Sequence, residues 1–474
     1  MTDLPPPPEP GSGVPPGPGS GVPSAQYPPT PPLAPPPSPV PPGAIRAVGQ
    51  WPGSTDDVPP PRKVPFWVVA LAIVAVGAIL GGLFAVVSDD GQNDGDDVAS
   101  FERDTTTTEP SDESPPGTEP EATLPSSEFQ AVVEEIEDFV AAERGLPFLR
   151  PVIVELADDA EFEQRLLEDF DEEVAEIETT GHVLRALGLL APGTDLVAGF
   201  RSLLGAGVVG FYDPETDELV VRGTSASPYV RAVIAHELVH ALDDQHFELD
   251  RPELEDVSDE TGFGFTALVE GNASRVEAAY RATFSTAEES EARAEESQIG
   301  AGYDFDEIPL TLFESIAAPY LLGPTLVEHI IEAGGQELLD AAFADPPATS
   351  EALLDPDVYV QRQPVLPVPA PAADGAEIDR HVIGAMGLAQ LLGELSFILS
   401  GFGELSPAVE GWGGDAYVAW LDGSRACVRA NLVGDSATDT AEIAAALQEW
   451  SASPPFDVVA TVAVGEVVTL TSCG

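Results

Sequence analysis

From about residue 125 to the C-terminus, apolar and polar residues alternate with regular periods, and these periods predict the helices and strands of this region. Residues 127–140 carry apolar side chains at helical spacing. In 207–222, two β-rich runs flank the turn formers Asp213, Pro214 and Asp217, which is the pattern of a hairpin. The same reasoning predicts further helices at 158–177, 182–204, from 228 onward, 264–280, 310–318, 323–344, 382–399 and 439–450, and strands at 152–156, 416–420, 425–432, 457–462 and 465–472.

These elements predict an α+β fold. A mainly helical domain with a small β-sheet is expected over 125–400, followed by a small α+β segment over 401–474. Within the helical domain, the charged stretch 286–298 is expected to be a solvated segment. The proline-rich stretch 345–373 is expected to cross between helices without regular structure.

The N-terminal part of the chain has a different pattern. Residues 1–65 hold 24 of the 48 prolines and almost no bulky apolar side chains, so a disordered tail is expected. Residues 66–87 form a 22-residue apolar run, which is long enough for a transmembrane helix. Residues 88–124 are acidic and rich in Thr, Ser, Pro and Gly, and predict a disordered stalk.

The charges beside the apolar run predict its orientation. Arg62 and Lys63 precede it, and Asp89 and Asp90 follow it, so the positive-inside rule places the tail in the cytoplasm and the folded region outside the cell. The tail contains P-x-x-P sequences that can bind a partner domain. The formal net charge of −63 is expected to repel nucleic acid.

The two cysteines, Cys427 and Cys473, lie near the C-terminus. In a chain expected to be exported, a pair of cysteines favours a disulfide over a metal pair. We therefore expect a bond that joins the last strand to the C-terminal sheet.

A metal-binding motif, H-E-x-x-H, lies at His236, Glu237 and His240. Ser227 and Pro228 supply an N-cap and a first-turn proline, so a helix is expected to begin there. On that helix the two imidazoles lie one turn apart on the same face and can share Zn²⁺. The carboxylate of Glu237 is the matching general base for water beside such an ion.

Two residues are candidates for the third ligand. His246 has the spacing of H-E-x-x-H-x-x-G-x-x-H, but Asp243 stands where that pattern has the glycine that breaks the helix. Glu270 lies beside an apolar stripe on a second predicted helix, and with it the site is a His₂Glu zinc site. Both alternatives stay open at this point, with Glu270 favoured.

Other residues are expected to support the site. Ligating histidines need an acceptor for their second ring nitrogen, and the candidates are Asp244, Ser274 and Glu277. Tyr320 and His329 are candidate donors to a tetrahedral oxyanion.

Several sequence motifs together resemble those of a group of poorly characterised bacterial zinc metallopeptidases. The motifs are H-E-L-V-H-A-L-D-D-Q-H-F at 236–247, G-F-Y-D-P-E-T at 210–216, A-L-V-E-G-N-A at 267–273, P-Y-x-x-G at 319–323, P-P-A-T-S-E-A-L-L-D-P-D-V-Y at 346–359 and G-W-G-G-D-A-Y at 411–417. The resemblance covers roughly residues 127–450. Asp355 departs from it, since a histidine is expected there, and Ser274 stands where thermolysin has an aspartate.

This group resembles the gluzincins, the thermolysin-like class. The resemblance implies a zincin-like domain with His236, His240 and Glu270 as ligands and Glu237 as general base. It also implies that an extended peptide substrate pairs with the 207–222 hairpin. The expected function is a membrane-anchored, extracellular zinc metallopeptidase; the alternative is a zinc-stabilised surface module that binds a partner without hydrolysis.

Overall fold

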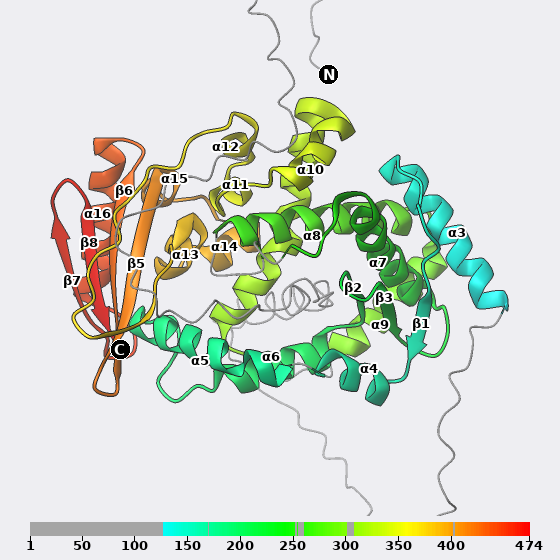
Figure 1. Cartoon of the computed structure of the whole chain (residues 1–474), viewed down its shortest axis with the longest axis horizontal. Coiled ribbons are helices and arrows are strands. Elements are labelled where there is room, and N and C mark those ends of the chain that lie inside the picture. The colour runs from blue at the N-terminus through cyan, green and yellow to red at the C-terminus, as the bar shows by residue number, and fades with distance from the viewer. Residues whose placement is uncertain (1–126, 169, 252–253, 255–259, 301–307, 402) are drawn as a thin grey trace, which may run out of the picture. The chain divides into compact units, whose positions relative to one another are not determined.

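The computed structural model describes residues 127–474, apart from 169, 252–253, 255–259, 301–307 and 402 (Figure 1). The expected tail at 1–65, transmembrane helix at 66–87 and stalk at 88–124 lie outside the described residues and stay predictions. The described part is a mixed fold, mainly helical with two small sheets, so the coarse α+β expectation is confirmed.

The first sheet carries the predicted hairpin. Its strands are β1 (Val154–Ala157), β2 (Gly210–Asp213) and β3 (Glu218–Arg222), in the order β1-β3-β2. β1 is parallel to β3, and β2 is antiparallel to β3. At the turn, the Asp213 side chain accepts hydrogen bonds from the Glu215 amide and the Thr216 hydroxyl, and Asp217 has a positive φ of 62°. This order leaves β2 at the edge of the sheet.

The helices before the hairpin end at different places from those predicted. They are α3 (Ser127–Arg144), α4 (Asp159–Leu166), α5 (Phe170–Ala186) and α6 (Leu196–Gly207). The predicted break near 180 is wrong, because α5 continues to Ala186, and Gly188 just after it takes a positive φ of 69°. α6 starts only after Asp195, whose side chain caps it by accepting from the Ala198 amide.

The helices that follow the hairpin are α7 (Pro228–Phe247), α8 (Glu260–Arg281), α9 (Thr286–Gly300) and α10 (Leu310–Ala344). The stretch 286–298, expected to be solvated, lies in the regular helix α9; its side chains are exposed or half-buried except Ala292, which is buried in the core next to α7.

α10 consists of two helical segments, as the sequence predicted, but the break between them is not at 319–322. It continues through Pro319 and Pro324 and departs from helical geometry at Gly335. Close packing against α8 outweighs the cost of about 3 kcal/mol for a proline inside a helix. Of the described helices, α10 is long and apolar enough to cross a membrane, but it lies mid-chain and 61% of its most apolar window is buried. Core helices share these features, so α10 is weak evidence for a membrane span.

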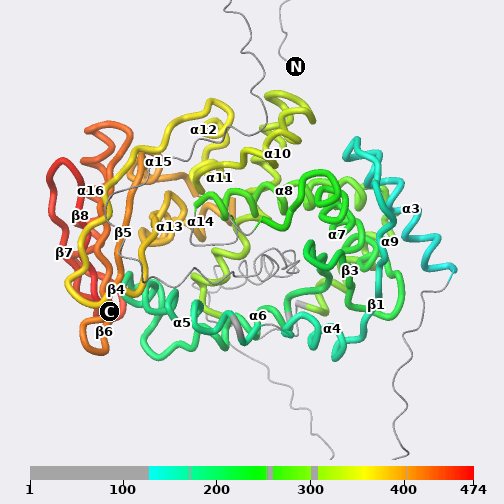
Figure 2. Tube along the Cα trace, viewed as in Figure 1, coloured from blue at the N-terminus to red at the C-terminus, as the bar shows by residue number. Residues whose placement is uncertain are grey.

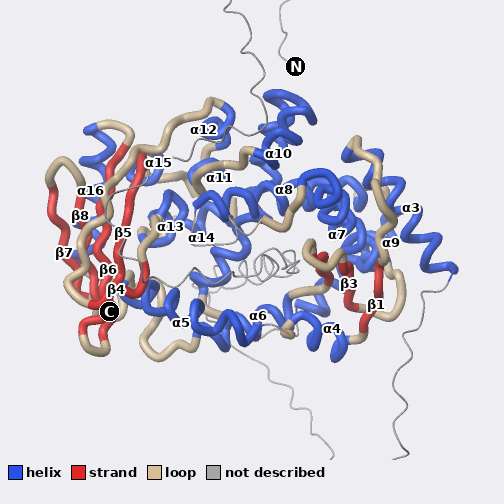
Figure 3. The backbone as a smooth tube through the Cα atoms, in the orientation of Figure 1, coloured by secondary structure: helices blue, strands red, loops and turns tan. Residues whose placement is uncertain are grey.

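The second sheet lies near the C-terminus. Its strands are β4 (Ala376–Asp379), β5 (Trp412–Asp422), β6 (Arg425–Gly434), β7 (Val459–Val464) and β8 (Val468–Cys473), in the order β4-β5-β6-β8-β7. All pairs are antiparallel, and α16 (Ala437–Ala452) packs on the sheet. Figure 3 shows the strands of the two sheets in separate groups with helices between them. β4 was not expected from the sequence.

Short helices connect the two parts. α11 (Glu351–Leu354) and α12 (Pro356–Val360) lie in the stretch that was expected to be irregular. The single helix expected at 382–399 is two, α13 (Gly384–Leu391) and α14 (Leu395–Leu399), because Gly393 has a positive φ of 75°. α15 (Pro407–Glu410) leads into β5.

The C-terminal sheet shares its hydrophobic core with the central helices. One buried cluster contains Leu268 of α8, Leu326 of α10 and Leu470 of β8. α5 belongs to the first part of the described chain, and it lies beside β6 and β8 from the C-terminal part (Figure 2). Cys427 and Cys473 form a disulfide and are register partners on β6 and β8. The last strand is therefore held both by packing and by a covalent bond.

Candidate metal centre

α7 places the H-E-x-x-H motif inside the protein. The helix starts where predicted, with the Ser227 hydroxyl accepting from the Val230 amide at 3.2 Å and Pro228 in the first turn. Almost the whole helix is buried, and His236, Glu237 and His240 are 1%, 1% and 6% exposed. Polar side chains at this depth need partners, because burying an unpaired polar group costs free energy.

α8 brings Glu270 to the two histidines. Glu270 is fully buried, and the next residue, Gly271, lies against Gly323 of α10. A Cβ at Gly271 would be 2.3 Å from the carbonyl carbon of Gly323, so the two backbones touch. This close crossing fixes α8 between α7 and α10, next to the motif.

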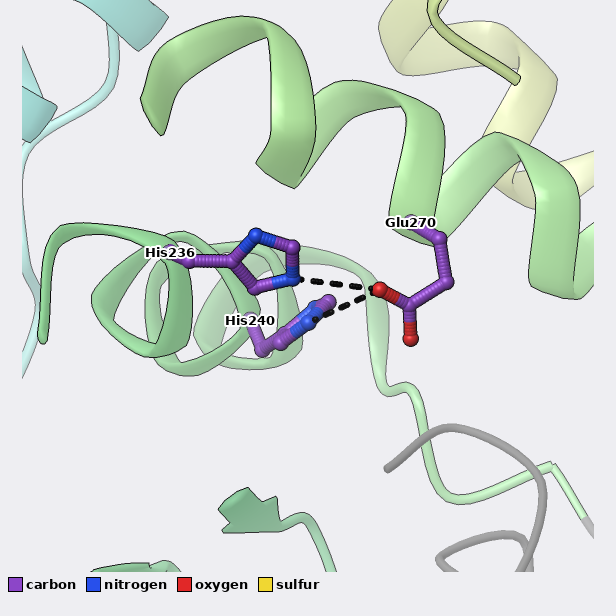
Figure 4. A group of neighbouring side chains, drawn as sticks. All are labelled: His236, His240 and Glu270. Atoms are coloured by element: carbon purple, nitrogen blue, oxygen red, sulfur yellow. Dashed lines mark hydrogen bonds and ion pairs between the residues drawn. The ribbon is translucent and has the colours of Figure 1, made fainter. Parts of the chain in front are cut away.

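The three side chains converge on one point (Figure 4). Nε2 of His236 lies 3.1 Å from Oε2 of Glu270, and Nε2 of His240 lies 3.5 Å from the same oxygen. The candidate ligand atoms of the three residues all lie within 4.8 Å of one another. In a tetrahedral zinc site, bonds of about 2.0–2.2 Å put neighbouring ligand atoms roughly 3.3–3.5 Å apart. The cluster therefore has the donor atoms and the spacing to hold a metal ion.

The electrostatics of the cluster favour positive charge. Burial alone would lower the pKa of His236, but its hydrogen bonds to Glu270 and Glu277 outweigh this effect and raise the pKa to about 10. Burial alone would raise the pKa of Glu270, but the charge of His240 and the hydrogen bonds of both histidines lower it. The Oε1 atom of Glu270 is buried without a hydrogen-bond partner among the described residues. One carboxylate between two imidazoles is an arrangement that could hold a cation.

Glu237 lies on α7 beside the cluster and packs against the edge strand β2. A Cβ at Gly210 would be 3.1 Å from Oε1 of Glu237 and 2.5 Å from a methyl of Val233, so only glycine lets the strand approach this closely. Oε2 of Glu237 is buried and has no hydrogen-bond partner within the described part of the chain. Burial raises the pKa of this carboxyl to about 7, against the lowering effect of His240 and His236. Glu237 is thus a carboxyl that can accept or release a proton near neutral pH.

One of the three candidate supporting residues contacts a histidine of the cluster. Oε2 of Glu277 lies 3.2 Å from Nδ1 of His236, and Oε1 of Glu277 lies 3.8 Å from Arg281. Ser274 is half-buried on α8 and makes no side-chain hydrogen bond with the described residues.

Asp244 has a different role from the expected one. Its Oδ2 accepts a hydrogen bond from the Tyr212 hydroxyl at 2.8 Å and from Arg150 at 3.2 Å. Its Oδ1 accepts from the Leu249 amide at 2.9 Å. Asp244 therefore joins the end of α7 to β2 and to the loop before β1, and no hydrogen bond to His240 is formed in the described structure.

The alternative ligand His246 is not part of the cluster. α7 continues unbroken to Phe247, so His246 lies ten residues, or about 15 Å, along the helix from His236. Its Nε2 atom lies 2.8 Å from the carbonyl oxygen of Pro147. With Asp243 in place of glycine the helix does not bend, and the third side chain at the cluster is Glu270.

The two candidate oxyanion donors lie in different surroundings. Tyr320 is 8% exposed, and its ring stacks on His236 with centroids 6.3 Å apart and an interplanar angle of 21°. His329 lies nine residues further along α10, about 13 Å, and pairs with Asp357 at 2.8 Å near the surface. The expectation that His329 donates to an oxyanion at the cluster is therefore corrected, whereas Tyr320 lies next to the cluster.

Sequence reasoning missed the buried partners of Asp243. Arg144 Nε donates to its Oδ1 at 2.8 Å, and Asn272 Nδ2 donates to its Oδ2 at 2.6 Å. An aspartate inside an apolar helix was the available signal, because a buried carboxylate needs a cation or donors. The sequence did not show which arginine supplies the charge.

Comparisons of the chain with protein-family models, with curated proteins and with solved structures each found no match.

Proposed function

We propose that this protein is a zinc metallopeptidase, anchored in the membrane by residues 66–87 and acting outside the cell. The observation that carries the proposal is the convergence of His236, His240 and Glu270 next to Glu237. Two imidazoles and one carboxylate leave a coordination position open, as catalytic zinc sites do. The sequence resemblance to gluzincins supports the same assignment.

The chain's own atoms suit Zn²⁺. The ion would be held by Nε2 of His236, Nε2 of His240 and the carboxylate of Glu270, whose Oε1 has no other partner among the described residues. When bound, zinc supplies Lewis-acid chemistry, since it makes water more acidic and polarises a carbonyl group. Glu277 would orient His236 by accepting a hydrogen bond from its Nδ1 atom.

Glu237 would act as the general base and then as the general acid. Its buried Oε2 has no partner among the described residues, so it is available to take a proton from the attacking water. The raised pKa of Glu237 suits both roles, because the same carboxyl can release the proton to the departing amine. Tyr320, stacked on His236, is the candidate donor to the developing oxyanion.

The substrate would be an extended peptide that adds to the edge of the first sheet. β2 is an edge strand, and Gly210 within it touches Glu237. A peptide that pairs with β2 would lie with its backbone next to the general base. The net charge of −63 disfavours nucleic acid as a partner, and the proline-rich tail is a candidate ligand for a cytoplasmic partner domain.

Zinc content and peptide hydrolysis of the purified full-length protein test this function. Glu237→Gln should keep its zinc and lose at least about 100-fold in cleavage rate, because it lacks the general base. Glu270→Ala should lose zinc. His246→Ala, which changes a histidine on the same helix away from the cluster, should keep both zinc and activity.

Three results would contradict the proposal. Cleavage by Glu237→Gln at the rate of the unmutated protein would exclude the general-base role. Zinc that is bound by the unmutated protein without any cleavage of peptides or casein would favour the non-hydrolytic binding module. Loss of zinc in His246→Ala but not in Glu270→Ala would assign a different ligand set.

A further inference from the structure

A short buried hydrogen bond joins the two helices that carry the cluster. Asn272 Nδ2 on α8 donates to Asp243 Oδ2 on α7 at 2.6 Å. Asp243 lies three residues after His240, and Asn272 lies two residues after Glu270. The bond therefore joins α7 and α8 within one helical turn of His240 on α7 and of Glu270 on α8.

The bond belongs to a larger network, which we call the Asp243 network and define as Arg144, Asp243, Asn272 and Asp340. Arg144 Nε donates to Asp243 Oδ1 at 2.8 Å, and Arg144 Nη1 donates to Asp340 Oδ1 at 2.7 Å. The network thereby links α3, α7, α8 and α10. The side chains of Arg144 and Asp243 are 0% and 1% exposed, and Asn272 is fully buried.

Stability alone gives little reason for such a network. Desolvating a buried ion pair costs free energy, and an apolar replacement of similar volume is often as stable. Directional bonds do restrict how helices slide, since a shift of one residue along a helix axis is about 1.5 Å and breaks a hydrogen bond. The cluster needs this restriction, because its Nε2–Oε2 separations of 3.1 and 3.5 Å leave little tolerance.

We infer that Asp243 and Asn272 are positioning residues whose hydrogen bond sets the distance between the histidine pair and Glu270. Within the described part of the chain, neither side chain hydrogen-bonds to a candidate ligand atom; Asp243 acts through α7 and Asn272 through α8. The inference rests on the metal-binding part of the proposed function. It predicts that breaking this one bond weakens metal binding even when the protein stays folded.

Binding of Co²⁺ to the full-length protein tests the inference, with affinity and the visible absorption spectrum as readouts. Asn272→Asp places two carboxylates face to face and breaks the bond by repulsion. We expect its Co²⁺ affinity to fall about 10- to 100-fold, the range for residues that support metal ligands, with a changed spectrum.

The double variant Asp243→Asn/Asn272→Asp exchanges the amide and the carboxylate. The hydrogen bond between positions 243 and 272 can reform, and Arg144 keeps an oxygen acceptor at position 243. The new carboxylate at position 272 has a cation nearby, because Arg275 lies 3.4 Å from the side-chain oxygen of Asn272. We expect Co²⁺ affinity and spectrum to return close to those of the unmutated protein. A residue with only a structural role would change the stability but not the spectrum of the folded protein.

Ser472→Ala is the matched control, because it removes a buried hydrogen bond to the Ala186 carbonyl oxygen far from the cluster in the sequence. It should destabilise the protein and leave Co²⁺ binding unchanged. If Asn272→Asp does not fold, Asn272→Ser removes the same bond without adding charge and carries the test.

The outcomes separate this inference from the proposed function. If the unmutated protein binds Co²⁺ and Asn272→Asp binds it with equal affinity and spectrum, the positioning role is wrong and the metal site stands. Failure of the double variant to recover binding also overturns the positioning role. If the unmutated protein binds no Co²⁺, the metal site and the positioning role both fall.

Discussion

At the scale of single residues, the close approach of Gly210 to the side chains of Val233 and Glu237 constrains the neighbourhood of the cluster. The side chains of Val233 and Glu237 on α7 occupy the space that any side chain at position 210 would need. Small displacements of a catalytic group have large effects, because about 1 Å of misplacement can cost roughly 100-fold in rate. Gly210 therefore controls where the Glu237 carboxylate lies.

We predict that Gly210→Ala lowers peptide cleavage by about 10- to 100-fold while zinc content stays near that of the unmutated protein. The added methyl would be 3.1 Å from Oε1 of Glu237 and 2.5 Å from Val233, so one of these side chains must move. Cleavage rates and zinc content of the full-length protein measure the effect.

Gly205→Ala on α6 is a suitable control for this substitution. Its methyl would meet only the end of the Glu163 side chain at 3.3 Å, which can move aside. Equal rates for Gly210→Ala and the unmutated protein would show that the close approach has no role in placing Glu237.

At the scale of secondary-structure elements, α13 depends on a cap from another element. Its first amides have no cap from their own segment; Asp415 on β5 instead accepts from the Ile383 amide at 2.7 Å and the Gly384 amide at 2.9 Å. Trp412 Nε1 also donates to this carboxylate at 2.8 Å. Burial nevertheless raises the pKa of Asp415 from 3.8 to about 6.

This raised pKa predicts a pH dependence of stability. The folded protein binds the Asp415 proton more tightly than the unfolded chain, so the contribution of this group to stability is greatest below about pH 4 and is lost as the pH rises to about 6. The loss is about 3 kcal/mol, since each pKa unit corresponds to about 1.4 kcal/mol.

Urea unfolding of the unmutated protein and of Asp415→Asn at several pH values measures this effect. The difference between their free energies of unfolding should change by about 3 kcal/mol between pH 3 and pH 7, with the unmutated protein losing stability relative to the variant. A difference that stays constant with pH would show that Asp415 does not titrate in this range.

The helix and strand boundaries show which elements local sequence can predict. α7 begins at its expected N-cap because Ser227 and Pro228 act on the next few residues only. β4 was missed because its pairing partner, β5, lies more than thirty residues away and supplies the hydrogen bonds that define it. The break predicted in α10 at 319–322 is absent, because packing against α8, and not local propensity, keeps the chain helical across Pro319 and Pro324.

At the scale of the whole molecule, the last strand couples the C-terminus to the central helices. β8 contributes Leu470 to the core that also contains Leu268 of α8, two residues before Glu270. Cys427 and Cys473 close a loop with a sequence separation of 46 residues. In the chain-entropy model such a loop contributes about 4 kcal/mol to stability.

We predict that Cys427→Ser/Cys473→Ser lowers the free energy of unfolding by about 2–4 kcal/mol. Urea unfolding of the full-length protein with and without a reductant measures it, and the reductant should have no further effect on the double variant. An unmutated protein whose unfolding midpoint is unaffected by complete reduction would contradict this prediction.

The sequence by itself determined the features that depend on near neighbours. Helical spacing brings His236, Glu237 and His240 within one turn of each other, and the two cysteines have only each other as partners. Only the tertiary structure decided between Glu270 and His246 at the cluster, and only it found Gly210 and the Asp243 network. These features depend on how α7, α8, α10 and β2 pack against one another. That packing is set by many side chains that are distant in the sequence, and no local spacing specifies it.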